Sequence, residues 1–278
     1  MIQLFHIEDY VVDTSKFDHA LHDSGVVEFE KEFADYVGAK YACSISSATN
    51  AIFLTFLQKD ITVNVPSIIP PVVLNAIING GNRIGFIDNV DWVGDSYILH
   101  DFGDYKVIDS AQKVERDQFK KEASPQDLMF FKEAVLNGMS YASNNWERNI
   151  KFPGWKMYLN SFQAYVAHQN FLKLPAKMSK LKEIREFYND SLGYENTSSH
   201  LYRIAVENNK SALVHMREKG VVCGIHYDAA HQNKVYNKQI IHCPNSAFVA
   251  ETTLSIPFNE KLTKNEVNHI VDCVREIQ

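Results

Sequence analysis

The sequence predicts an α/β protein in which a mostly parallel sheet is flanked by helices, with a small α+β domain at the C-terminal end. Short apolar runs alternate along the chain with segments of helical periodicity, as in proteins with parallel sheets. Proline and glycine residues mark many boundaries between these segments. The length of 278 residues suffices for one large domain and a smaller one. We therefore expect a large domain at residues 1–160 and a small domain at residues 161–278.

The N-terminal part predicts a helix, a strand and a second helix. A single apolar face predicts a helix over residues 26–37, with Gly38 as its C-cap. The apolar run at residues 41–45 predicts a short buried strand, and residues 51–57 predict a helix. The polar turn between them, residues 46–50, presents hydroxyls and backbone N–H groups at a positive helix end. Such a turn suits an anion such as phosphate, and it is equally compatible with an ordinary Ser/Thr N-cap.

The remaining apolar runs predict six further strands, and the remaining periodic segments predict five further helices. The strands are expected at residues 61–65, 83–87, 105–108, 128–131, 201–206 and 221–227. The helices are expected at residues 72–79, 161–174, 177–192, 210–219 and 263–277. Gly220 ends the fourth of these helices, and Thr263 with Glu266 forms a capping box at the start of the last.

Asp109 directly follows the strand expected at residues 105–108 and opens the string Asp-Ser-Ala-Gln. Open α/β sheets bind their ligands at the carboxyl ends of the strands. A carboxylate held there can pair with a cationic ring nitrogen, as cofactors of the pyridoxal phosphate (PLP) type require. An acidic residue after a strand is also a common helix N-cap, so the interpretation of Asp109 as a cofactor-binding residue depends on the other motifs.

Composition and charge exclude several classes of protein. The formal charge of -6, from 28 basic and 34 acidic residues, offers no basic face for a nucleic-acid backbone. No apolar run is long enough to span a membrane, and the N-terminus lacks the features of a signal peptide. The four cysteines form no C-x-x-C pair, which predicts a reduced, cytoplasmic setting. The histidines have no recognised ligand spacing, so we expect no metal site.

Several strings, in their order along the chain, resemble the DegT/DnrJ/EryC1/StrS family of PLP-dependent sugar aminotransferases. They are residues 27–38, 47–52, 65–67, 75–77, 107–112, 154–155, 163–164, 224–227, His231 and 254–257. The resemblance implies a fold like that of fold type I aminotransferases, with a large PLP-binding domain. It also implies transfer of an amino group from glutamate to a keto sugar, usually one linked to a nucleotide.

The resemblance further implies roles for the matching residues that would hold the cofactor. Ser47, Ala48 and Thr49 would bind the phosphate of PLP through backbone N–H groups and hydroxyls. Asp109 would pair with the pyridine nitrogen and keep it protonated. Gln112 would lie near the phenolic oxygen of the ring.

Two lysines and a His-Tyr pair complete the set of implied site residues. Lys132, just after the strand expected at residues 128–131, would form the Schiff base, although it comes several residues earlier than the family lysine. Lys156 stands where the family has an asparagine that reaches the cofactor phosphate of the partner subunit, and it would supply positive charge there. His226 and Tyr227 would lie on the substrate side. The resemblance therefore also implies a homodimer whose active site is completed across the subunit interface.

The sequence departs from the family in two further places. Residues 68–71 replace the family's aromatic residue and threonine, which removes an expected stacking contact with the cofactor. The stretch from residue 88 to residue 105 is shorter than the family norm, by about a helix and a strand. These departures leave two other functions open. One is a catalytically degenerate member that acts as a binding or regulatory subunit, and the other is a PLP-dependent sugar dehydratase or epimerase.

Overall fold

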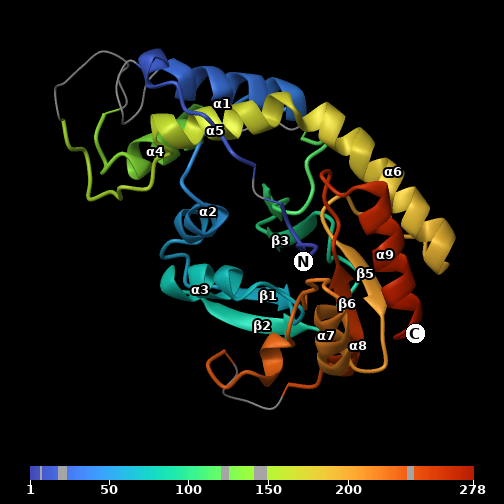
Figure 1. The fold of residues 1–278 in the computed structure, drawn as a ribbon. Helices are drawn as coiled ribbons and strands as arrows, with labels where there is room; N and C mark the ends of the chain where they lie inside the picture. Colours follow the sequence, from blue (N-terminus) through green and yellow to red (C-terminus); the bar gives the residue numbers. More distant parts are fainter. Residues whose placement is uncertain (7, 18–23, 120–124, 141–148, 237–240) are drawn as a thin grey trace. The chain divides into compact units, whose positions relative to one another are not determined.

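The computed structural model describes residues 1–6, 8–17, 24–119, 125–140, 149–236 and 241–278 (Figure 1). The chain divides into two compact units. Unit 1 consists of Met1–Glu8, Phe56–Lys113 and Pro175–Gln278, and unit 2 consists of Asp9–Thr55 and Val114–Leu174. Each unit is made of segments that are distant in the sequence, and each is described here by itself. The domain boundary expected at residue 160 stays a prediction.

In unit 1, a parallel strand pair is formed by β1 (Thr62–Pro66) and β2 (Arg83–Ile87), connected through helix α3 (Pro71–Asn79). Pro71 opens α3, where its missing N–H leaves no bond unmade. Val63 of β1 is fully buried, as are several apolar side chains of α3. The expected strands at residues 61–65 and 83–87 and the helix between them are therefore confirmed within one or two residues.

The next pair, β3 (Tyr97–Asp101) and β4 (Lys106–Asp109), is antiparallel, and its register places Tyr97 opposite Asp109. Strand β4 was expected from the sequence, whereas β3 was not. Only residues 102–105 connect β3 to β4, and because a parallel connection needs a crossover of a dozen or more residues, these two strands form an antiparallel hairpin.

The expectation of a mostly parallel sheet is wrong for the residues that the structure describes. They form three separate two-stranded sheets, and only β1 with β2 is parallel. Part of the physical reason is the tight connection between β3 and β4, which allows only antiparallel pairing.

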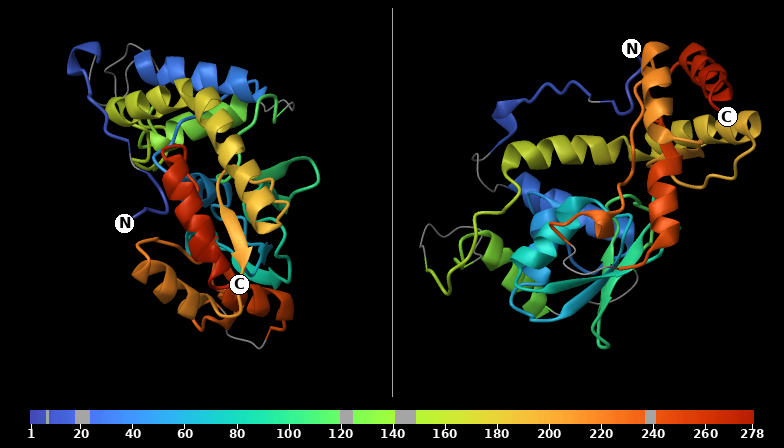
Figure 2. Two further views of the ribbon diagram at one scale, coloured as in Figure 1. Left: turned by 45° about the vertical axis from the view of Figure 1, so that its right-hand side comes forward. Right: turned by 90° about the horizontal axis from the view of Figure 1, so that it is seen from below.

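The C-terminal part of unit 1 packs helices on one face of an antiparallel pair, β5 (Tyr202–Ala205) and β6 (Thr253–Ile256). Figures 1 and 2 show α9 running beside these strands. These helices are α6 (Leu174–Leu192), α7 (Asn209–Glu218) and α9 (Lys264–Arg275). Helix α8 (Pro244–Thr252) contributes Ala250 to a separate apolar cluster with Ile68 and with Ala229, the residue before the 3-10 turn η2 (Ala230–Gln232). The core between strands and helices is apolar and includes Tyr202, Ile204, Leu254 and Ile256.

Two sequence expectations for this part have different outcomes. The capping box of Thr263 and Glu266 at the start of α9 is confirmed, with both reciprocal hydrogen bonds present. The strand expected at residues 221–227 is wrong, since the backbone makes only isolated bridges there, at Val221 and Gly224. The apolar residues of this segment pack against the core without a continuous ladder.

Unit 2 contains η1 (Thr14–Lys16) and four helices, α1 (Ser24–Val37), α2 (Ala48–Thr55), α4 (Pro125–Val135) and α5 (Ser161–Leu172). Helices α1 and α5 lie side by side (Figure 1) and share a cluster of phenylalanine rings. Helix α5 begins with a capping box formed by Asn160 and Gln163. Gly38 follows α1 with φ 73°, as its predicted role of C-cap requires.

The strand expected at residues 128–131 is wrong, because these residues belong to helix α4. A short apolar run in a buried helix cannot be distinguished from a buried strand by periodicity. The run 41–45 also forms no strand, only a single bridge from Ile45 to Tyr158. Among the described residues, no helix is both long enough and apolar enough to cross a lipid bilayer.

Candidate active site

Asp109 of unit 1 ends β4 with its carboxylate held by two hydrogen bonds. Tyr97 Oη donates to Oδ2 at 2.9 Å, and the backbone N–H of Ala111 donates to Oδ1 at 3.0 Å. Burial raises the pKa of Tyr97, and the charge of Asp109 raises it further, so the phenol stays protonated and acts as the donor. A carboxylate has about four acceptor positions, so Asp109 can accept one more hydrogen bond from a protonated ring nitrogen.

Gln112 follows Asp109 by three residues in the sequence. Its side chain is buried and links two segments of unit 1 by hydrogen bonds. Its Oε1 accepts a hydrogen bond from the N–H of Gly94 at 2.6 Å, and its Nε2 donates to Tyr227 Oη at 2.8 Å. Trp92 stacks on Tyr227 with 6.5 Å between ring centroids and lies 4.4 Å from the ring of Tyr97. Two predicted site residues, Gln112 and Tyr227, are therefore in direct contact, within an aromatic surrounding.

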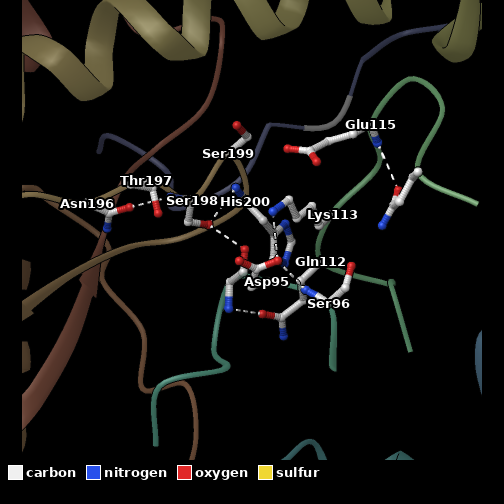
Figure 3. Close-up of polar contacts among 12 residues, drawn as sticks. Asp95, Ser96, Gln112, Lys113, Glu115, Asn196, Thr197, Ser198, Ser199 and His200 are labelled. Carbon is white, nitrogen blue, oxygen red and sulfur yellow. Dashed lines mark hydrogen bonds and ion pairs between the residues drawn. The ribbon is translucent and has the colours of Figure 1, made fainter. Parts of the chain in front are cut away.

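A second set of polar contacts fixes the loop that carries Gly94 (Figure 3). Ser198 Oγ donates to the carbonyl of Gly94 at 3.1 Å, and Lys113 Nζ lies 2.9 Å from a carboxylate oxygen of Asp95. Gly94 has φ 94°, and a Cβ there would lie 2.6 Å from Ser198 Oγ. The loop is thus held from both sides in a conformation that favours glycine.

His226, which the family resemblance predicts on the substrate side, has its Nδ1 2.9 Å from Ser255 Oγ. Burial lowers the pKa of His226 to about 4, with contributions from His200 and from the positive charge of Arg203. Burial also lowers the pKa of His200. At neutral pH both imidazoles are uncharged and serve as hydrogen-bonding groups rather than cations.

In unit 2, Ser47, Ala48 and Thr49 lie at the start of α2, which begins three residues before the helix expected at residues 51–57 and takes in part of the expected turn. Ser47 acts as the N-cap, since its Oγ accepts a hydrogen bond from the N–H of Asn50 at 3.2 Å. The first N–H groups of a helix have no acceptor within the helix, and the helix dipole is positive there. The start of α2 can therefore bind an anion such as a phosphate group.

Lys132 lies on α4, with its side chain only 13% exposed, and forms an ion pair with Glu30 of α1. The distance from Nζ to Glu30 Oε2 is 2.8 Å, and the side chain of Glu30 is 6% exposed. The other oxygen, Oε1, accepts hydrogen bonds from Ser44 N at 2.7 Å and Ser44 Oγ at 2.8 Å. Burial, together with the charge of Glu30, raises the pKa of the nearby Cys43 to about 12. Lys156 is exposed, and its backbone pairs with Leu136.

The fold shows the class of protein. The aminotransferase TlmJ from Streptoalloteichus hindustanus superposes with a TM-score of 0.74 over 92% of this chain and 91% of that chain, at 17% identity. The PMP-form of the putative sugar aminotransferase Spr1654 from Streptococcus pneumoniae superposes with a TM-score of 0.75, over 95% and 94% of the two chains, at 14% identity. The chain therefore has an α/β aminotransferase fold.

The family follows from the sequence. The model of the DegT/DnrJ/EryC1/StrS aminotransferase family matches residues 6–91 and 129–275, and the chain belongs to this family, whose members use PLP. The spore coat polysaccharide biosynthesis protein SpsC of Bacillus subtilis (strain 168) is 23% identical, with 91% of this chain and 89% of SpsC covered. A UDP-4-amino-4,6-dideoxy-N-acetyl-beta-L-altrosamine transaminase of Campylobacter jejuni is 22% identical, with the same two coverages.

The match also shows that this chain is shorter than its relative. Its alignment with SpsC is 346 residues long, whereas the chain has 278, so the relative carries segments that are absent here. The family model leaves out residues 92–128, which include Asp109 and Gln112. The roles of these two residues therefore depend on the string at residues 107–112 and on their contacts in unit 1.

Sequence reasoning missed three residues of unit 1, of which Trp92 and Tyr97 belong to this region. Tyr97 bonds to Asp109, and Trp92 donates its indole N–H to the carbonyl of Ile68 at 2.9 Å. Trp92 thus brings an aromatic ring to residues 68–71, where the family's aromatic residue is replaced. Arg203 is the third, and its signal in the sequence is a single charge within the apolar run 201–206. Among the described residues, no group of three or more His, Cys, Asp or Glu side chains could hold a metal ion.

We expect His226 to make stability depend on pH in a defined window. Its pKa in the folded protein, about 4, lies below the ordinary 6.5, so the unfolded chain binds the proton more readily. The stabilisation is complete above pH 6.5 and is lost as the pH falls towards 4, by about 1–2 kcal/mol after allowing for partial exposure. Urea unfolding between pH 4 and pH 7 should show a flatter profile for His226→Gln than for the wild type.

Proposed function

We propose that this protein is a PLP-dependent aminotransferase that transfers an amino group, from glutamate, to a keto sugar linked to a nucleotide. The support is the family, together with relatives that include a nucleotide-sugar transaminase and a polysaccharide biosynthesis protein. In this proposal the protein works in the cytoplasm, in polysaccharide or related sugar biosynthesis, as a homodimer.

The observation that carries the proposal is the setting of Asp109. Its carboxylate receives hydrogen bonds from a protonated phenol and a backbone N–H, and it keeps an acceptor position for a ring N–H. When bound, PLP supplies an electron sink, which depends on a protonated ring nitrogen. Asp109 would hold that proton, and Tyr97 would fix the orientation of the carboxylate.

The proposal assigns the remaining parts of the cofactor to other residues of the chain. The start of α2, with Ser47, Ala48 and Thr49, would bind the phosphate, and Lys156 would add positive charge to a phosphate of the partner subunit. Gln112 would orient Tyr227 through their hydrogen bond. Lys132 would carry the cofactor and move protons, after its amine leaves Glu30 and loses its own proton.

The same ion pair favours a second candidate function, that of a catalytically degenerate family member. An amine that pairs with a buried carboxylate is held in its charged form, which is not nucleophilic. In this case the chain would bind the cofactor or a nucleotide sugar without turnover and act as a binding or regulatory subunit. Borohydride reduction of the PLP-loaded protein, followed by peptide mapping, separates the two candidates. A reduced adduct on Lys132 supports the enzyme, and uptake of PLP without an adduct supports the degenerate member.

We expect Asp109→Asn to reduce aminotransferase activity by on the order of 100-fold, because the ring nitrogen would lose its charged partner. The tests are the rate of amino transfer from glutamate to nucleotide-linked keto sugars and the dissociation constant of PLP. Tyr97→Phe is the matched control, since it removes one hydrogen bond to the carboxylate and leaves its charge, so a smaller loss is expected. Equal activity of Asp109→Asn and wild type would contradict the role of Asp109.

A further inference from the structure

Ser67 lies directly after β1, at the carboxyl end of the strand, and its side chain is fully buried. The carboxyl ends of parallel strands are where open α/β sheets bind their ligands. The backbone N–H of Ser67 donates to the carbonyl of Ile87 at 3.0 Å, which ties Ser67 to the end of β2. The carbonyl of Ser67 accepts a hydrogen bond from the N–H of Ala230 at 2.9 Å. Ser67 therefore joins the parallel strand pair to the turn η2.

The hydroxyl of Ser67 forms two further contacts with His231, which is also buried. The backbone N–H of His231 donates to Ser67 Oγ at 3.2 Å, and Oγ lies 2.6 Å from His231 Nδ1. Burial lowers the pKa of His231, so the ring is uncharged at neutral pH and has one acceptor nitrogen. If Nδ1 carried the proton, the buried hydroxyl proton would have no acceptor among the described residues. The hydroxyl therefore donates to Nδ1, and the proton of the neutral ring belongs to Nε2.

The segment that ends at His231 carries His226 and Tyr227, and hydrogen bonds fix it along its length. At one end, the ring of His226 bonds to strand β6 through Nδ1. Next to it, Tyr227 Oη accepts a hydrogen bond from Gln112 Nε2 at 2.8 Å. At the other end, His231 bonds to Ser67 through both its backbone and its ring. The Ser67–His231 pair thus fixes this segment to the end of β1.

Apolar packing carries this restraint from the pair to Tyr227. Ile68, the neighbour of Ser67, forms an antiparallel bridge with Ala229. Ile68 and Ala229 belong to one apolar cluster, and Tyr227 packs against it. Trp92 donates its indole N–H to the carbonyl of Ile68 at 2.9 Å and stacks on Tyr227. The position of the Tyr227 ring therefore depends on where Ser67 and Ile68 hold the segment.

We propose that Ser67 and His231 are positioning residues, which hold the segment 226–231 so that Tyr227 reaches Gln112. A shift of the segment would leave both the hydroxyl and Nδ1 buried without their partner, which is costly. The pair therefore permits one position of the segment rather than a range of positions. This position of Tyr227 is a property of unit 1 by itself, whereas its use on the substrate side rests on the proposed function.

The test places fluorotyrosine at position 227 of the full-length protein and records its fluorine NMR signal at neutral pH, without PLP or sugar. The wild type should give a signal well separated from that of the urea-unfolded protein. Ser67→Ala and His231→Leu should each move the signal towards the unfolded position and narrow it, because the released ring becomes mobile and exposed. His231→Asn should keep the wild-type signal, since an amide oxygen can accept the hydroxyl proton in place of Nδ1.

Ser246→Ala is the matched control, because Ser246 is a fully buried serine of α8 whose Oγ bonds to Asp88 at 2.7 Å. It should lower the urea midpoint, as Ser67→Ala does, and leave the fluorine signal unchanged. Unchanged signals in Ser67→Ala and His231→Leu would overturn the proposal, as would an equal shift in Ser246→Ala. If Ser67→Ala does not fold, equal signals in His231→Asn and His231→Leu would overturn it.

A turnover assay separates this role from the proposed function. Ser67→Ala should raise the KM for the keto sugar about tenfold, whereas His231→Asn should keep the wild-type KM. Absence of turnover in the wild type, together with the expected shifts of the fluorine signal, would defeat the aminotransferase and leave the positioning pair standing.

Discussion

Lys132→Met is expected to lower the free energy of unfolding by about 3–5 kcal/mol in the absence of PLP, because it leaves the carboxylate of Glu30 buried without its cation. Glu30 is almost fully buried, and the two hydrogen bonds from Ser44 do not compensate its charge. Urea unfolding at neutral pH measures the change. The matched control is Lys180→Met, whose ion pair with Glu183 is exposed and should contribute less than about 0.5 kcal/mol.

A double-mutant cycle with Glu30→Gln tests whether the ion pair is the cause. Glu30→Gln and Lys132→Met should each destabilise strongly, and the double variant should be much less destabilised than the sum of the two. Additive effects, or a loss below about 1 kcal/mol for Lys132→Met, would show that the pair contributes nothing specific. The result also bears on the proposed function. A lysine that stabilises α1 against α4 must break that pair before it can react, and the free energy of the pair sets how readily it does so.

The parts of the fold that the sequence predicted correctly are those determined by local signals. The capping box of Thr263 and Glu266 and the C-cap glycine Gly38 each act within one turn, and both are found where expected. The strand expected at residues 128–131 failed because an apolar run of four residues has no period of its own. Strand β3 was not predicted, and its antiparallel pairing with β4 is determined by the short connection between the two strands rather than by a local pattern.

The residues of the candidate site also divide into those that a local sequence signal predicts and those that only the tertiary structure reveals. Asp109 could be found from the sequence, because its place after an apolar run is a local signal. Its partner Tyr97 could not, since only the antiparallel register brings the two together. The pairing of Lys132 with Glu30 joins residues 102 positions apart, and no spacing rule predicts it. The sequence therefore predicted the candidate residues Asp109 and Lys132, whereas their partners Tyr97 and Glu30 were found only in the structure.

Gly138→Ala should be the most destabilising small substitution in unit 2, by about 3–5 kcal/mol or enough to prevent folding. Gly138 has φ 71°, and a Cβ there would lie 1.8 Å from the carbonyl oxygen of Phe152, so the backbone itself must move. Gly154 faces the same contact from the other side, with a Cβ 2.0 Å from the N atom of Gly138. The two glycines let the end of α4 approach residues 152–154, where Gly138 accepts a hydrogen bond from Lys151 N at 2.8 Å.

Two further alanine variants separate the steric effect from the backbone conformation. Gly154→Ala introduces the clash without a positive φ, and we expect it to destabilise by about 2–4 kcal/mol. Gly81→Ala has φ 87° and no atom within 4 Å, so it should cost only about 1–2 kcal/mol. Urea midpoints of the three variants give the comparison. If Gly138→Ala unfolds at the same urea concentration as Gly81→Ala, the close approach at residues 138 and 154 does not exist in the folded protein. If Gly138→Ala and Gly154→Ala both lose several kcal/mol, close packing of these two glycines holds the chain just after α4, three residues beyond the helix that carries Lys132.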